Sequence, residues 1–282
     1  MIQERPPAIA EPSLATALSE ARRAPRLRLL LDYDGTLVPL AGSPELAAPD
    51  EELLSLLAEL AALPGVDVDI VSGRPRQTLE EWLGSVPLSL WAEHGFWYRP
   101  SPDAAWHAAT TAGLDWMNRL RPILEQFTDS TPGSLIEVKS ASMAWHYRGA
   151  GQEFGSRQAH ELRLLLDHAF SNQPVEVLDG HKVIEVRLQG VSKALAADQI
   201  ERSAILDTAV IAIGDDRTDE DLFRALPGSA VTIAVGRRPT CARFRVEDDR
   251  AVRVLLRRLL ATKPSPLGDG RGGYPLAVAS TA

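Results

Sequence analysis

Cysteine is almost absent from this sequence, because Cys241 is the only one among 282 residues. A single cysteine cannot form an internal disulfide, which excludes the disulfide framework that holds many small secreted domains together. The sequence around Cys241 offers no activating neighbour, so we interpret this residue as an inert small side chain rather than a reactive thiol.

Long apolar runs are also lacking. The longest apolar stretch, residues 53–63, is interrupted by Ser55 and Glu59 and is too short to cross a bilayer core of about 30 Å. Residues 1–13 carry charges and prolines where a secretory signal would have an apolar segment. We therefore expect a cytoplasmic protein with no membrane partner.

Positive charge is in deficit. The chain has 30 Lys and Arg against 38 Asp and Glu, which gives a formal net charge of −8. A negative mean field disfavours nucleic acid as a partner, and an anionic small molecule would need a local positive site. The hydrophobic content of 45% is typical of a globular protein with one large domain or two ordinary ones.

Four apolar segments end in polar turns, as strands do at the carboxyl edge of a parallel sheet. Helical periodicity follows the first of them in residues 50–63 and stops at Pro64 and Gly65. This alternation predicts an α/β fold with a doubly wound, Rossmann-like parallel sheet, in which distant motifs meet in one crevice. The four predicted strands are residues 26–31, 66–71, 88–92 and 208–213.

The pattern changes in the middle of the chain to helix, strand, strand, helix, strand, strand. Short turns between the paired strands indicate hairpins, and therefore an inserted α+β cap. We predict core segments at 14–105 and 189–262, a cap at 106–188, and disordered tails at 1–13 and 263–282. The predicted cap elements are helices at 114–127 and 153–170 and strands at 135–139, 143–147, 175–178 and 183–187.

The strongest motif is DYDGT, residues 32–36, directly after a strand of leucines. Two carboxylates spaced by one residue at a strand end can place one side chain against an electrophile and the other near its leaving group. Asp is a competent nucleophile toward phosphorus once a cation offsets the repulsion between the two anions. The alternative is a turn in which the aspartates only satisfy backbone donors.

A second acidic cluster lies in GDDRTDE, residues 214–220. Clustered carboxylates repel each other unless a cation holds them together, and oxygen ligands in this setting favour Mg²⁺. Asp215 is the first choice as a ligand. In the alternative interpretation Asp216, Asp219 and Glu220 only occupy a helix N-terminus, where negative charge is favourable.

Two further segments could hold phosphoryl oxygens. Ser72 and Gly73 offer a hydroxyl and a flexible backbone before a helix N-terminus. Lys193 begins a helix that returns to the core, and its ammonium is a compact positive charge. An isolated lysine is more often a solvated surface residue, so the role of Lys193 depends on the other motifs.

These segments, in this order and with a cap between the second and third, resemble the four motifs of the haloacid dehalogenase superfamily. Within it, the local strings SGR, EHG, EVK, HYR, KVIE and GDDRTDE resemble those of trehalose-6-phosphate phosphatases. They occupy residues 72–74, 93–95, 137–139, 146–148, 182–185 and 214–220.

The resemblance implies a role for each matching position. Asp32 would attack phosphorus and bind Mg²⁺ together with the Asp34 main-chain carbonyl and the Asp215 carboxylate, while Asp34 would serve as general acid and base. The other implied roles are phosphate binding by Ser72, Gly73 and Lys193 and indirect support of the metal by Asp216 and Asp219. Asp216 could instead orient Lys193. Ala194 departs from the family, which usually has Gly after the motif lysine.

The resemblance also implies a set of sugar contacts. The alternative is that the cap residues are ordinary cross-strand charges paired with Glu137 or Glu185. The implied substrate-binding residues are Arg74, Glu93, His94, Lys139, His146, Arg148 and Glu185.

The expected reaction is hydrolysis of trehalose 6-phosphate to trehalose and phosphate through an aspartyl-phosphate on Asp32, with functional coupling to a trehalose-phosphate synthase. One rival keeps this chemistry but uses a sucrose, mannosylglycerate or glucosylglycerol phosphate. Another is a non-catalytic module that senses sugar phosphates, against which the intact set of motif residues argues.

Overall fold

The computed structural model describes residues 13–41, 44–109, 113–180, 182–202 and 207–261. The predicted tails, residues 1–13 and 263–282, lie outside this part of the chain except for Ser13. Among the described residues, no helix combines the length and the apolar character needed to span a membrane.

The core is an eight-stranded sheet in the order β12-β11-β10-β1-β2-β3-β4-β5. Six strands are parallel, and β4 and β5 extend one edge in antiparallel fashion. The four strands expected from the sequence are present as β1, β2, β3 and β10. The bounds are β1 Arg26–Leu31, β2 Val66–Val71, β3 Ser89–Ala92, β4 Trp97–Arg99, β5 His107–Ala108, β10 Thr208–Gly214, β11 Val231–Val235 and β12 Phe244–Val246.

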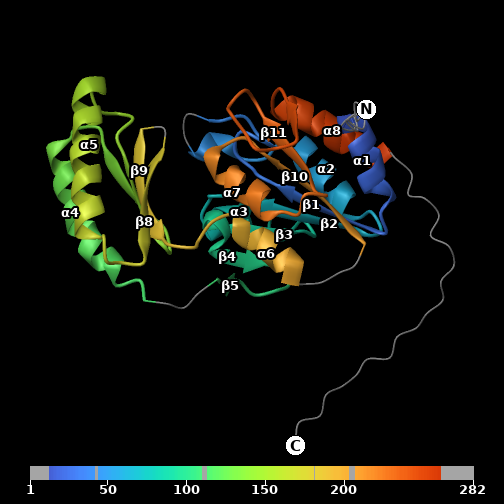
Figure 1. Ribbon diagram of the computed structural model, residues 1–282, viewed down its shortest axis with the longest axis horizontal. Helices are drawn as coiled ribbons and strands as arrows, with labels where there is room; N and C mark the ends of the chain where they lie inside the picture. The colour runs from blue at the N-terminus through green and yellow to red at the C-terminus, as the bar shows by residue number, and fades with distance from the viewer. Residues whose placement is uncertain (1–12, 42–43, 110–112, 181, 203–206, 262–282) are drawn as a thin grey trace, which may run out of the picture.

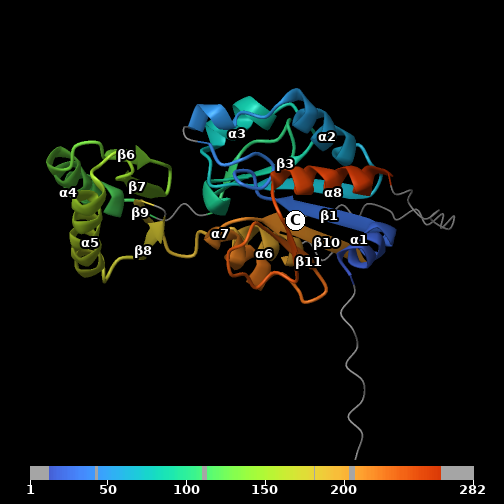
Figure 2. The same ribbon diagram turned by 90° about the horizontal axis from the view of Figure 1, so that it is seen from above.

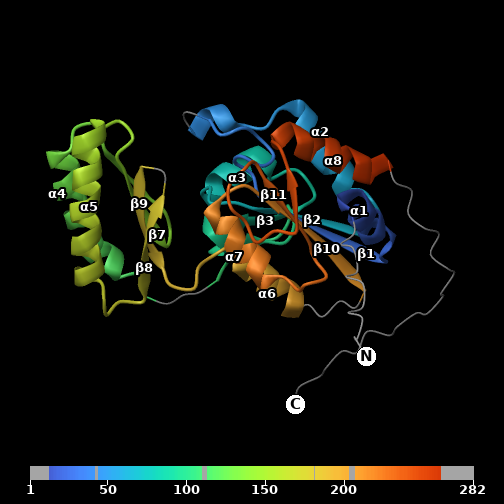
Figure 3. The ribbon, with the colours of Figure 1, turned by 45° about the horizontal axis from the view of Figure 1, so that its top comes forward.

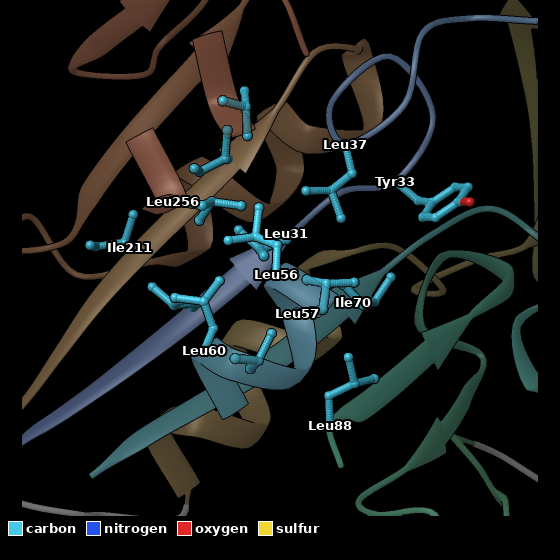
Figure 4. Close-up of a cluster of buried hydrophobic side chains, with 14 of the residues drawn as sticks. Leu31, Tyr33, Leu37, Leu56, Leu57, Leu60, Ile70, Leu88, Ile211 and Leu256 are labelled. Atoms are coloured by element: carbon cyan, nitrogen blue, oxygen red, sulfur yellow. The ribbon is translucent and has the colours of Figure 1, made fainter. Parts of the chain in front are cut away.

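Helices cover both faces of this sheet, which confirms the doubly wound fold (Figure 2). Side chains alternate between the faces along β1: Leu29 and Leu31 join one apolar cluster and Leu30 joins the other. Figure 4 shows the larger cluster, where side chains of α2 and α8 meet those of the central strands. The core helices are α1 Leu14–Arg23, α2 Glu51–Ala61, α3 Arg76–Leu83, α6 Ala194–Arg202, α7 Arg217–Ala225 and α8 Asp249–Ala261, with 3-10 turns η1 Pro44–Ala47 and η2 Glu93–Gly95.

A second, four-stranded antiparallel sheet, in the order β6-β7-β9-β8, forms the predicted cap beside the core (Figure 1). Its two helices cover the face that is turned away from the core (Figure 3). The other face of the sheet is therefore turned toward the core. The bounds are α4 Trp116–Ser130, β6 Leu135–Val138, β7 Ser142–His146, α5 Gln152–Ala169, β8 Val175–Gly180 and β9 Val183–Leu188.

The division into core segments 14–105 and 189–262 and a cap at 106–188 stays a proposal. The pairing of β5 with β4 assigns His107 and Ala108 to the core sheet, so we move the start of the proposed cap past Ala108. A small apolar cluster of Phe96, Ala141, Leu188 and Val191 lies where the two parts meet.

A buried ion pair ties the two central strands together. Asp69 is fully buried on β2 and accepts two hydrogen bonds from the Arg28 guanidinium on β1, both at 2.8 Å. The indole N–H of Trp91 on β3 donates a third, at 2.9 Å. One carboxylate thus connects the three neighbouring strands β1, β2 and β3.

Replacing this carboxylate should destabilise the fold strongly. Asp69→Ala would leave the Arg28 charge buried without a counter-ion, and we expect a loss of about 3–5 kcal/mol in the free energy of unfolding. Asp67→Ala on the same strand removes the partner of Arg26 from a pair that is about two-fifths exposed, and should cost less than about 1 kcal/mol. Urea unfolding followed by circular dichroism measures both, and equal losses would contradict the argument.

Candidate active site

The site lies at the carboxyl edge of the parallel sheet, where β1 and β10 are neighbours. Asp32 directly follows β1, and its N–H donates to the Ile213 carbonyl at 3.0 Å. Asp215 follows β10, and one carboxylate oxygen each from Asp32, Asp215 and Asp219 lies within 4.8 Å of the other two. The two acidic motifs therefore meet as the sequence predicted.

Lys193 compensates this concentration of negative charge. Its side chain is almost fully buried, and its ammonium donates to Asp32 Oδ1 at 2.6 Å and to Asp219 Oδ1 at 2.8 Å. Burial alone would lower the pKa of Lys193, but the charges of Asp219 and Asp32 raise that pKa well above its ordinary value. The lysine is thus a permanent cation inside the site and not a solvated surface residue.

Asp219 forms hydrogen bonds to several parts of the site. From the sequence we expected it either to occupy a helix N-terminus only or to support the metal indirectly. Its Oδ2 accepts the backbone N–H groups of Asp215 and Asp216 at 3.0 and 3.1 Å, while its Oδ1 accepts from Lys193. Asp216 completes a capping box at the start of α7 and accepts from Thr218. Both oxygens of Asp219 thus accept hydrogen bonds, and its predicted indirect support of the metal stays a proposal.

One carboxylate oxygen of Asp215 lacks a hydrogen-bond partner in the described part of the chain. Its Oδ1 is buried and accepts no hydrogen bond from the described residues. Burial, followed by the charge of Asp32, raises the pKa of Asp215 to about 8. Burial also raises the pKa of Asp32, although Lys193 acts in the opposite direction. An unpartnered oxygen beside a second carboxylate fits a hard divalent cation, which would remove this cost.

Asp34 is bound by Arg74. The guanidinium donates from Nε to Asp34 Oδ2 at 2.8 Å and from Nη2 to Asp34 Oδ1 at 2.5 Å. Arg74 also lies 5.0 Å from the centre of the Trp82 ring. Arg74 was predicted from the sequence to bind substrate. In the structure its guanidinium orients Asp34, the residue predicted to act as both general acid and general base.

Ser72 and Gly73 form the loop that precedes α3. The Ser72 hydroxyl is buried and accepts the Arg74 N–H at 3.1 Å. A Cβ on Gly73 would lie 2.5 Å from the His94 ring, so the imidazole packs on this loop as closely as a glycine allows. The predicted phosphate-binding segment and His94 are therefore parts of one packed unit.

Charged residues gather on the core-facing side of the cap sheet. His146 Nε2 lies 2.9 Å from Glu137 Oε2, and the Lys139 ammonium lies 3.9 Å from Glu137 and 3.7 Å from Glu185. Arg148 is exposed in the turn after β7. The sequence named Glu137 only as a counter-charge, but its alternation with Lys139 could have placed it on the same face.

His94 of the core lines a small cavity together with Ser142 and Glu185 of the cap. Burial lowers the pKa of its imidazole to about 4, with Glu185 acting in the opposite direction, so the ring is neutral at pH 7. Burial would raise the pKa of Glu185, yet Lys139 and His94 lower it to about 2. The sequence missed Arg187, which is buried on β9, binds Glu176 at 2.6 Å and approaches Asp221 of α7 at 3.7 Å.

A model of the trehalose-phosphatase family matches residues 30–249. The chain belongs to this family. It is 44% identical over 241 residues to a bifunctional trehalose-6-phosphate synthase/phosphatase of Thermoproteus tenax, a match that covers 86% of this chain and 33% of that protein. It is 40% identical over 216 residues to a trehalose-phosphatase of Schizosaccharomyces pombe, covering 74% of this chain and 26% of that one.

A solved structure supports the same assignment. The C-terminal domain of the trehalose-6-phosphate phosphatase of Candida albicans superposes with a TM-score of 0.81 at 28% identity, covering 89% of this chain and 97% of that domain. This likeness confirms the predicted fold class and the resemblance. The chain spans about a third of the length of several curated relatives that it matches.

The glycine after Asp34 should be essential to this trehalose-phosphatase family site. Gly35 has φ +82°, and a Cβ there would lie 2.4 Å from Asp215 Oδ2. Gly35→Ala should therefore displace Asp215 and lower kcat for a small phosphate ester about 100-fold. Gly190→Ala is the matched control, since Gly190 has φ +83° but a Cβ there would meet nothing within 4 Å beyond its chain neighbours.

Both variants should lose about 1–3 kcal/mol of stability from the left-handed backbone. Only Gly35→Ala should lose activity. Similar kcat values for the two variants would show that the approach to Asp215 is unimportant.

Proposed function

We propose that this chain hydrolyses trehalose 6-phosphate to trehalose and phosphate, with Mg²⁺ as cofactor and an aspartyl-phosphate on Asp32 as intermediate. The observation that carries the proposal is the buried pair of Asp32 and Lys193 beside the unpartnered oxygen of Asp215, in a chain of the trehalose-phosphatase family. The names of its relatives support the choice of substrate.

The core residues would divide the reaction into two displacements. An Asp32 carboxylate oxygen attacks phosphorus, while Asp34 gives a proton to the sugar oxygen that leaves. Asp34 then takes a proton from water, whose oxygen attacks the phosphoryl group and releases phosphate from Asp32. Bound Mg²⁺, held by the carboxylates of Asp32 and Asp215 and by the main-chain carbonyl of Asp34, would supply charge neutralisation at phosphorus.

The positive groups of the site would hold the phosphoryl oxygens. Lys193 is oriented by two carboxylates, so its ammonium can bind a phosphoryl oxygen next to Asp32 without a change of conformation. Ser72 and the Gly73 backbone at the end of β2 lie at the same sheet edge. Lys193 would supply positive charge and the other two groups neutral donors, and bound Mg²⁺ would add the remaining positive charge that an anionic substrate needs in a chain of net charge −8.

The cap would select the sugar. Glu137, Lys139, His146 and Glu185 present acceptors and donors on one sheet face, which suits a ligand rich in hydroxyl groups. We also propose functional coupling to a trehalose-phosphate synthase, which the bifunctional name of the Thermoproteus relative supports. The cytoplasmic location predicted from the sequence stays part of this proposal.

The reaction can be tested on a panel of sugar phosphates. Phosphate release should be fastest from trehalose 6-phosphate, should stop when a chelator removes Mg²⁺, and should fall by at least about 10⁴-fold in Asp32→Asn because the nucleophile is lost. Greater activity on a sucrose, mannosylglycerate or glucosylglycerol phosphate would show that this sugar phosphate, and not trehalose 6-phosphate, is the preferred substrate. Binding without release from any member would favour the sensing module.

The sugar-binding role of the cap can be tested at Lys139. Lys139→Met removes a charged donor of about 1.5–3 kcal/mol, so kcat/KM for trehalose 6-phosphate should fall about 10- to 100-fold, with a smaller loss for p-nitrophenyl phosphate. Arg163→Ala is the control, because this cap arginine pairs with Asp167 and Asp179 on the helical side. An unchanged KM in Lys139→Met would leave Lys139 as a cross-strand charge.

A further inference from the structure

The Glu93 carboxylate of the core is bound to the cap hairpin β6–β7. Glu93, at the end of β3, is only 5% exposed. It accepts the backbone N–H of Ser140 at 2.7 Å and the Ser140 hydroxyl at 3.0 Å. The Trp97 indole donates to the same hydroxyl at 2.8 Å. Ser140 lies in the turn between β6 and β7, so these bonds join core and cap.

The backbone at Glu93 is held in a costly conformation. Glu93 has φ +51° and His94 has φ +58°, followed by Gly95 at +96°. Left-handed backbone costs a non-glycine residue about 1–2 kcal/mol, so the surroundings must impose it. In this backbone conformation the Glu93 side chain points toward Ser140, while the Glu93 backbone lies against the Ser72–Arg74 loop, which is the predicted phosphate-binding loop.

Backbone hydrogen bonds connect the same residues to that loop. The Glu93 N–H donates to the Arg74 carbonyl at 3.0 Å, and the His94 N–H donates to the Ser72 carbonyl at 2.9 Å. The loop that carries Ser72 and Arg74 is thus bonded to one side of Glu93, and the cap hairpin to the other. A displacement of Ser140 would be transmitted to the phosphate loop through one residue.

The engaged oxygens of Glu93 change the role expected for it. Both accept a hydrogen bond from Ser140, and Glu93 is only 5% exposed, so little of the carboxylate is accessible to a sugar hydroxyl. Lys139 directly precedes Ser140, and its ammonium lies among the cap carboxylates. The position of Ser140 therefore determines where the cap residues stand relative to the phosphate.

We propose that Glu93 is a positioning residue, which fixes the β6–β7 turn against the Ser72–Arg74 loop and so sets the separation between the sugar-binding and phosphate-binding groups. This inference rests on the proposed phosphatase function. Glu93 then acts on the substrate through Ser140 and not by direct contact.

Kinetics of a double-mutant cycle separate the two roles. Glu93→Ala should lower kcat/KM for trehalose 6-phosphate about 10-fold and Ser140→Ala about 3-fold, while the double variant should be no worse than Glu93→Ala because the partners share their bonds. Glu93→Gln keeps an acceptor for the Ser140 N–H and a polar group at its hydroxyl, so it should stay within about twofold of wild type. Ser134→Ala is the matched control, since the Ser134 hydroxyl bonds within the cap to the Thr131 carbonyl.

Direct binding of sugar by Glu93 would give another pattern. Ser140→Ala would then leave kcat/KM unchanged, or its decrease in kcat/KM would add fully to that of Glu93→Ala. Either result overturns the proposal. Ser140→Ala leaves the left-handed backbone untouched, so the test remains decisive even if Glu93→Ala does not fold.

A distance measurement without substrate completes the test. Spin labels on the exposed Cys241 of the core and on Leu164→Cys, 58% exposed on α5, report the separation of cap and core by pulsed electron paramagnetic resonance. The distance distribution should broaden in Glu93→Ala and Ser140→Ala but not in Ser134→Ala. Unchanged distributions overturn the proposal. Since no hydrolysis is needed, this result stands even if trehalose 6-phosphate is not the substrate.

Discussion

The buried ammonium of Lys193 between Asp32 and Asp219 is the interaction on which the site depends. Two carboxylates removed from water repel each other and lose hydration, and only a closely placed cation makes their burial tolerable. Lys193 lies 161 residues after Asp32 in the sequence. The ion pair that orients Asp32, the proposed nucleophile, therefore forms only when the chain has completed the cap and returned to the core, which makes the site a property of the whole fold.

Compensation by Lys193 is incomplete, and this leaves the site ready for a cation. Asp219 uses both oxygens for Lys193 and the backbone of the Asp215 loop, whereas Asp215 keeps a buried oxygen without a partner among the described residues. The absence of a side chain at Gly35 and Gly214 lets Asp215 and Asp219 approach their neighbours this closely. The buried carboxylates therefore repel each other where a divalent ion could bind and relieve that repulsion.

The sequence predicted the parts of this molecule that follow from local periodicity. The apolar strand before Asp32 and the paired cap strands were placed within a residue or two, and the strand-edge rule brought Asp32 and Asp215 together. Two- and three-residue strands such as β5 are too short to show a period. Side-chain pairs between distant segments were also missed, because Arg74 could be assigned to Asp34 only once the crevice geometry was known.

The phosphoryl group is the same in every sugar phosphate, so core chemistry alone cannot choose among them. In the proposed function, selection comes from the cap face that carries Glu137, Lys139 and Glu185, and it would affect the rate only if that face stood at the correct distance from Asp32. The buried His94 ring packs on Gly73 of the Ser72–Arg74 loop, and the neighbouring Glu93 is bonded to Ser140 of the cap. If Glu93 positions the cap hairpin as we propose, recognition of the sugar and transfer of the phosphate are coupled through one short, strained turn after β3.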